Sequence, residues 1–127
     1  MLDTNQDNIE IRDSVPDYRL PTILSVKARR IRYTAPKLKY FTSSFAKYDE
    51  VIEIVVTTDA PIPIRADSPM LYVGETKTVE MEIIDEKTYR FLLFDTDKIK
   101  EGDNISWQWM TQQREKPIAT KFKFSLQ

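Results

Sequence analysis

The segment Val51-Ile52-Glu53-Ile54-Val55-Val56 is the clearest β-strand in this sequence of 127 residues. Five of its six residues are β-branched, and apolar side chains fall on both of the faces that alternate along a strand. Strands that are apolar on both faces are typical of positions covered from two sides. The segment therefore predicts a central strand with other strands arranged around it.

A longer strand is expected upstream, from Ile23 to Thr34. Apolar and basic residues alternate from Leu24 to Arg29, and the alternation breaks at Arg30. A one-residue β-bulge at Arg29-Arg30 would explain the break. A shorter strand is expected from Leu38 to Thr42.

The chain downstream of the central strand divides into short strands and polar loops. The two prolines within Asp59–Pro63 cannot donate to a strand ladder, so this segment is expected at a sheet edge or in a crossover. Alternation on either side of Asp85-Glu86 predicts a β-hairpin, whose second strand is apolar on both faces and should lie in mid-sheet. Further strands are expected at residues 69–73, at residues 105–110 and over Phe122, Phe124 and Leu126.

Together these segments predict an all-β chain. Seven to nine short strands, several of them spaced by 8–12 residues, are typical of an antiparallel β-sandwich, and an immunoglobulin-like topology is favoured on architecture alone. No segment carries a helical apolar period over three turns. Residues 1–20 are polar and acidic with interrupting prolines, so we expect a flexible acidic tail followed by a single domain over residues 21–127.

Composition removes several kinds of chemistry. The chain has no cysteine and no histidine, which excludes disulfides, thiolate metal sites and the commonest general base and zinc ligand. The acidic loop at residues 95–104 departs from the calcium-loop pattern, because Ile99 stands at its fifth position. We expect a non-catalytic protein with no cofactor and no metal. No apolar run approaches the roughly 18 residues of a membrane helix, so no membrane insertion is expected.

Charge is distributed unevenly along the chain. The formal net charge is −1, yet residues 18–48 hold eight basic residues and no acidic one. Such a region is a candidate anion-binding strip for nucleic acid or a sulfated glycan when aromatic residues accompany it. The same bases would also protect an edge strand from aggregation. The contact candidates in this basic strip, residues 27–40, are Lys27, Arg29, Arg32, Tyr33, Lys37, Lys39 and Tyr40.

The two tryptophans offer another candidate surface. Trp107 and Trp109 stand two residues apart on a predicted strand, so they share one face. An exposed pair would stack on sugar rings. Ile105 lies on the same face, however, and favours placing both indoles in the core.

These features predict a binding or interaction module that recognises another protein or a surface, with the basic strip as the leading contact region. One alternative is binding of nucleic acid or an acidic glycan by that strip. The other is carbohydrate binding through Trp107 and Trp109. The sequence indicates neither a compartment nor an oligomeric state.

Overall fold

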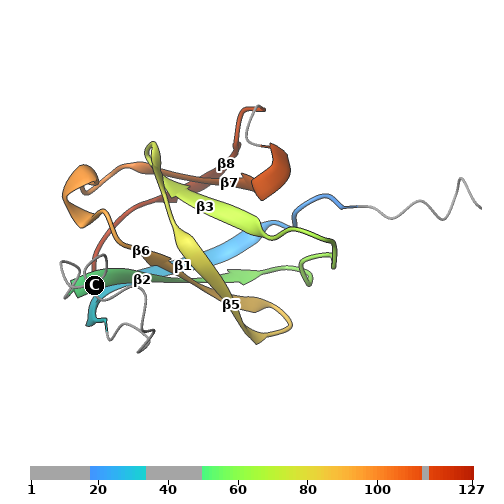
Figure 1. Cartoon of the computed structure of the whole chain (residues 1–127), viewed down its shortest axis with the longest axis horizontal. Coiled ribbons are helices and arrows are strands. Elements are labelled where there is room, and N and C mark those ends of the chain that lie inside the picture. Colours follow the sequence, from blue (N-terminus) through green and yellow to red (C-terminus); the bar gives the residue numbers. More distant parts are fainter. Residues whose placement is uncertain (1–17, 34–49, 113–114) are drawn as a thin grey trace, which may run out of the picture.

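The computed structural model describes residues 18–33, 50–112 and 115–127. Its strands are β1 (Ile23–Arg32), β2 (Glu50–Thr58), β3 (Pro69–Val73), β4 (Thr76–Lys77), β5 (Val79–Asp85), β6 (Thr88–Leu93), β7 (Asn104–Trp109) and β8 (Ile118–Lys123), and two 3₁₀ turns lie at η1 (Thr96–Lys98) and η2 (Met110–Gln112). The prediction of an all-β chain is confirmed (Figure 1). The strand expected from Leu38 to Thr42 lies outside the described residues.

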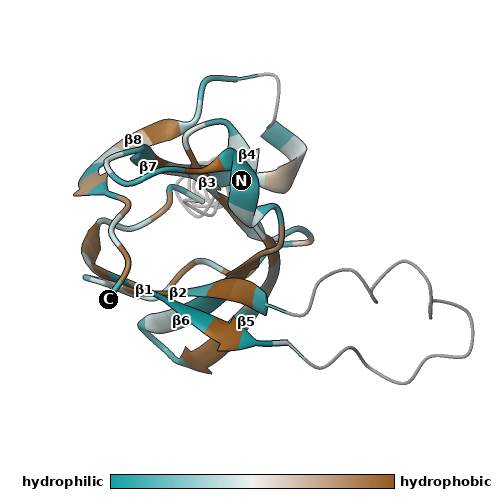
Figure 2. Ribbon diagram, turned by 90° about the vertical axis from the view of Figure 1, so that its left-hand side faces the viewer, coloured by the Kyte–Doolittle hydropathy of each residue, from teal (hydrophilic) through white to brown (hydrophobic). Residues whose placement is uncertain are grey.

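The strands form two antiparallel four-stranded sheets. One has the order β1-β2-β6-β5 and the other the order β4-β3-β7-β8. Figure 2 shows them as two layers, one above the other. The predicted central strand β2 and the second hairpin strand β6 are indeed the two interior strands of their sheet.

One core lies between the two sheets. Cross-strand neighbours on the inner face of the first sheet, such as Ile54 and Phe91, are buried, and so are Leu71 and Trp107 from the second sheet. These alternating inward positions all belong to the same hydrophobic cluster. Burial of each such side chain contributes about 1.5–3 kcal/mol to stability. The core therefore supplies most of the attraction between the layers.

Strands β4 and β5 are joined through Thr78, so the chain passes directly from the second sheet to the first. The buried hydroxyl of Thr78 donates to the Leu71 carbonyl at 2.9 Å and accepts from the Leu71 amide at 3.2 Å. The Thr78 amide also donates to the Leu71 carbonyl, at 2.9 Å. Thr78 thus joins the two sheets along this side of the molecule.

The opposite side is joined by the C-terminal residues. Strand β8 ends at Lys123, whereas the sequence predicted a strand over residues 122–126. Phe124 instead enters the core, and Leu126 makes a parallel bridge with Ala28 of β1. The Gln127 amide donates to the Ala28 carbonyl at 2.9 Å. The last residues therefore cover part of the β1 edge.

The bulge in β1 is not at Arg29-Arg30, as predicted, but near the start of the strand. The register with β2 shifts between Ile23 and Ser25 and then continues without a break to Arg32. The extra residue, Leu24, is 56% exposed, while Ile23 is buried. Arg30 lies on the same face as the buried Ala28 and is nevertheless exposed. A long side chain on an edge strand can reach water from that face, which is why the apolar alternation failed there.

Two turns also lie slightly away from their predicted positions. The β5–β6 turn falls at Glu86-Lys87, one residue later than expected. The sequence Lys98-Ile99-Lys100 also predicts one helical turn within the loop at residues 95–104, and the structure places this turn, η1, two residues earlier. The spacing of polar residues located both loops but did not fix their registers.

Replacing Thr78 with valine should destabilise the fold. Valine keeps the side-chain shape but cannot accept from the Leu71 amide or donate to its carbonyl. We expect the free energy of unfolding, measured by urea denaturation, to fall by about 1–2 kcal/mol. The half-buried Thr76 of β4 is the matched control, and its valine variant should change stability by less than about 0.5 kcal/mol. Equal losses in the two variants would contradict the assignment of the stabilising bonds to Thr78.

Candidate functional site

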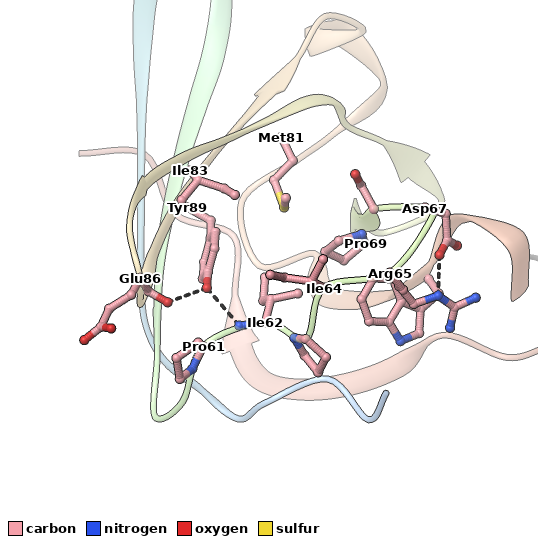
Figure 3. A pocket seen from close by; sticks show the side chains of 13 residues that line it. Pro61, Ile62, Ile64, Arg65, Asp67, Pro69, Met81, Ile83, Glu86 and Tyr89 are labelled. Carbon is pink, nitrogen blue, oxygen red and sulfur yellow. Dashed lines mark hydrogen bonds and ion pairs between the residues drawn. The ribbon is translucent and has the colours of Figure 1, made fainter. Parts of the chain in front are cut away.

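A groove of about 260 Å³ lies between the crossover from β2 to β3 and the β5–β6 hairpin (Figure 3). We call it the crossover groove. Its main apolar lining residues are Ile62, Ile64, Met81, Ile83, Tyr89 and Trp109. The groove thus takes side chains from both sheets and from the proline-containing segment between them.

The crossover is held in place by hydrogen bonds between its backbone and neighbouring side chains. The Tyr89 hydroxyl accepts from the Ile62 amide at 2.9 Å and donates to the Glu86 carbonyl at 2.5 Å. The Thr58 hydroxyl donates to the Ala60 carbonyl at 2.7 Å. Pro61 and Pro63 have no amide hydrogen, so they fit a segment that joins no sheet. The sequence predicted that Asp59–Pro63 lies at a sheet edge or in a crossover, and the segment is a crossover between the two sheets.

Two isoleucines at the groove expose apolar surface to solvent. The Ile64 side chain is 95% exposed and the Ile83 side chain is 64% exposed. Ile83 lies opposite Tyr89, on the face that carries the core, but β5 is the edge strand of its sheet. Two large apolar side chains beside one hollow form a patch rather than scattered exposure.

One end of the groove is closed by a charge-neutral cluster. The Arg65 guanidinium lies 4.5 Å from the Trp109 ring centroid and 5.3 Å from that of Tyr18, and it forms an ion pair with Asp67. Asp67 accepts from the Thr111 amide at 2.9 Å and from its hydroxyl at 2.8 Å. Burial raises the pKa of the Asp67 carboxyl, but the bonds from Thr111 and the charge of Arg65 outweigh burial and lower it. The positive charge of Arg65 is therefore already neutralised by Asp67.

The segment before β1 contributes to that end of the groove as well. The Trp109 indole N–H donates to the Tyr18 carbonyl at 2.5 Å. Among the described residues, packing contacts thus extend at least to Tyr18, which the sequence placed in the N-terminal tail. The prolines that suggested the boundary do not prevent the preceding residues from packing.

The other end of the groove is acidic. Glu86 lines this end, its exposed neighbours in the β5–β6 turn are Asp85 and Lys87, and the exposed Asp59 begins the adjoining crossover. Asp59 accepts from the Thr22 amide, and Asp85 accepts from the Lys87 amide, a bond that lowers the pKa of Asp85. The Glu86 carboxylate has no hydrogen-bond or ion-pair partner among the described residues, and it points into solvent in Figure 3. This end therefore presents uncompensated negative charge.

The described part of the predicted basic strip is split between the two faces of β1. Lys27, Arg29 and Arg32 are all exposed, as expected. The unbroken register, however, places Lys27 and Arg29 on the outer face and Arg32 on the opposite one. Tyr33 packs edge-on against Phe94, with 5.0 Å between ring centroids. Lys37, Lys39 and Tyr40 lie outside the described residues.

Arg29 is engaged in a row of charges that crosses all four strands of its sheet. Its Nε donates to Glu53 Oε1 at 2.8 Å, and Arg90 Nε donates to Glu53 Oε2 at 2.6 Å. Arg90 Nη1 in turn donates to Glu82 at 3.0 Å. Burial raises the pKa of the Glu53 carboxyl, but the bonds from Arg29 and Arg90 outweigh it and hold the pKa below its ordinary value. The only charged residue of the central segment 51–56 is thus a buried acceptor for two arginines.

The two tryptophans are core residues. Trp107 is 1% exposed and Trp109 is 3% exposed, so neither indole lies on an open sheet face. The placement in the core expected from Ile105 is confirmed, because cross-strand pairing with β3 turns this face of β7 inward. Stacking of a sugar on these rings would require the core to open.

The acidic loop at residues 95–104 is held by hydrogen bonds within the loop, one of them to the Asp103 carboxylate. Asp103 accepts from the Lys100 amide at 3.0 Å, and Gly102 adopts a φ of 89°, which favours glycine. Within residues 18–33, 50–112 and 115–127, no group of three or more acidic, histidine or cysteine side chains is placed to hold a metal. In the same ranges, no helix has the length and apolar character needed to cross a membrane.

The crossover groove was not predicted from the sequence. The run Pro61-Ile62-Pro63-Ile64 was a usable signal, because it puts apolar side chains in a segment that cannot join a ladder. The residues of β5 that complete the groove are about twenty positions away. Only the pairing of the strands brings the two segments together.

Replacing Glu53 with glutamine should weaken the fold near neutral pH. The amide cannot accept two charged hydrogen bonds, so we expect a loss of about 1–2 kcal/mol in urea denaturation. Because the folded-state pKa of Glu53 is lowered, its contribution is complete above the ordinary value of 4.5 and is lost as pH falls through the folded value. The difference in free energy of unfolding between the parent protein and the Glu53→Gln variant should therefore become smaller in acid. The exposed Glu82→Gln variant should lose less than about 1 kcal/mol, and a gap for Glu53→Gln that persisted in acid would refute the ionic explanation.

Comparisons with known proteins give no match for this chain, whether with protein-family models, with curated proteins or with solved structures.

Proposed function

We propose that this chain is a non-catalytic β-sandwich of immunoglobulin-like topology that binds another protein through the crossover groove. The strand order supports the topology. The order β1-β2-β6-β5 corresponds to the A-B-E-D sheet of that fold, and β4-β3-β7-β8 corresponds to C′-C-F-G. A single core between two antiparallel sheets is the arrangement such a sandwich requires.

The observation that carries the binding proposal is the exposure of Ile64 and Ile83 on the two sides of one groove. Contiguous apolar surface on a soluble domain marks places where a partner excludes water. The volume, about 260 Å³, is below the range of about 300–1,000 Å³ typical of small-molecule sites. A groove of this size suits the side chains of a protein partner better than a whole ligand.

The polar groups of the groove support a non-catalytic role. A general base needs a free acceptor within reach of the substrate. The Tyr89 hydroxyl already makes two hydrogen bonds, and Asp67 is bonded to Thr111 and paired with Arg65. The Glu86 carboxylate lies at the rim and points into solvent, away from the apolar interior of the groove. The groove therefore offers apolar surface and shape rather than a reactive group.

Site-specific photo-crosslinking tests the proposal directly. A benzophenone amino acid in place of Ile64 should crosslink a discrete partner in extracts of the source cells, because Ile64 lies at the mouth of the groove. The control position is Leu24, which is 56% exposed on the other edge strand. The adduct should disappear when Ile83→Ser is added. A partner that crosslinks from Leu24 and not from Ile64 would rule out the groove.

Binding of nucleic acid or an acidic glycan through β1 remains the second proposal. Titration with a heparin fragment or a single-stranded oligonucleotide distinguishes it, with amide NMR shifts as the readout. If the groove is the functional surface, shifts at residues 27–32 should be small and should not localise. Arg29 already forms an ion pair with Glu53 and is not available to an added anion. Localised shifts there that fade steeply as salt rises would favour the anion proposal over the groove.

A further inference from the structure

We infer that the partner segment held by the crossover groove carries an apolar residue next to a basic one, with the basic side chain at the Glu86 end. This inference rests on the proposed function and adds the chemistry and the orientation of the partner. It follows from three properties of the groove: its apolar middle, the difference in charge between its ends, and the irregular edge of β5.

The apolar middle determines the kind of anchor. Ile62, Met81 and Tyr89 line the interior of the groove, and the exposed Ile64 and Ile83 flank its opening. A leucine- or isoleucine-sized side chain matches this apolar lining. A polar side chain in the same place would lose its bonds to water without replacement.

The two ends of the groove determine the orientation. At one end, Arg65 is neutralised by Asp67 and stacked on Trp109, so it offers no free charge. At the other end, the Glu86 carboxylate lies at the rim of the groove, points into solvent and has no partner among the described residues. Asp85 beside it in the turn and Asp59 at the start of the crossover add negative charge, and within residues 58–60 and 85–88 Lys87 is the one base.

The acids at this end are held close together by backbone contacts. The Thr58 amide donates to the Lys87 carbonyl at 2.9 Å, which fixes the β5–β6 turn beside the start of the crossover. The charge excess is thus part of the folded structure beside the groove. A lysine or arginine is the side chain that complements it.

The edge of β5 indicates how the segment binds. The pairing of β5 with β6 shifts register between Val79 and Glu82 and again between Ile83 and Asp85. Bulges of this kind interrupt the regular row of backbone groups that strand addition requires. The partner is therefore held through inserted side chains rather than as an added β-strand.

Three blocked peptides test the inference against the full chain by amide NMR titration: acetyl-Ser-Lys-Leu-Leu-Ser-amide, the same peptide with glutamate for lysine, and the same peptide with serine for both leucines. The lysine peptide should shift amides at residues 62–65 and 81–86. The glutamate peptide should bind about two- to five-fold more weakly, the difference expected from one exposed ion pair. The serine peptide should produce no localised shifts.

Matched variants separate charge from apolar contact. Glu86→Gln should remove the preference for lysine over glutamate, whereas Glu75→Gln, an exposed acid of the β3–β4 turn, should leave it unchanged. Ile83→Ser should abolish binding of both leucine peptides, and Leu24→Ser should not. All four positions are exposed, so the spectra of the variants should otherwise match that of the parent protein.

The outcomes distinguish this inference from the proposed function. Equal binding of the lysine and glutamate peptides at the groove would overturn the inference and leave a protein-binding groove in place. Absence of localised shifts with every peptide would also overturn it, while crosslinking from Ile64 would still support the proposed function. Loss of that crosslink together with all peptide binding would remove both.

Discussion

The shared core between the two sheets is the constraint on which every exposed feature of this protein depends. Because β2 and β6 occupy the middle of the first sheet, β5 is left at its edge. Ile83 therefore points toward the side of the core but stays largely exposed. The crossover must then bridge from the end of β2 to the second sheet beside that edge. The groove is thus a consequence of how the strands are ordered, and the proposed binding surface follows from the same packing that stabilises the fold.

The sequence predicted the local features of this fold well because alternation is a local property. The central strand at residues 51–56 and the hairpin around residue 86 needed only their own residues to be recognised. The bulge at Leu24 was missed because register depends on the partner strand, and a one-residue slip moves side chains to the other face. Arg32 does not share a face with Arg29 because the bulge predicted between them is absent and the register there is unbroken. The groove was missed because its two sides meet only through the tertiary fold.

A count of charges along the chain also proved an incomplete guide to its surface. The bases of residues 18–48 suggested a single strip, yet Arg29 serves as a partner of the buried Glu53. Glu53 receives its other arginine from a strand 37 residues further on. In contrast, the unpaired negative charge at Glu86 stands in a segment of mixed sign that composition does not single out. Compensation within the fold, rather than local charge density, decides which charges are available to a partner.

The passage of the chain through Thr78 gives this protein a mechanical property. Most neighbouring sheets are joined by loops that can bend while each sheet stays intact. Here β4 and β5 run on from one sheet into the other, with a buried threonine at the junction. A pull applied to β5, at the border of the groove, is therefore transmitted along the backbone into the second sheet.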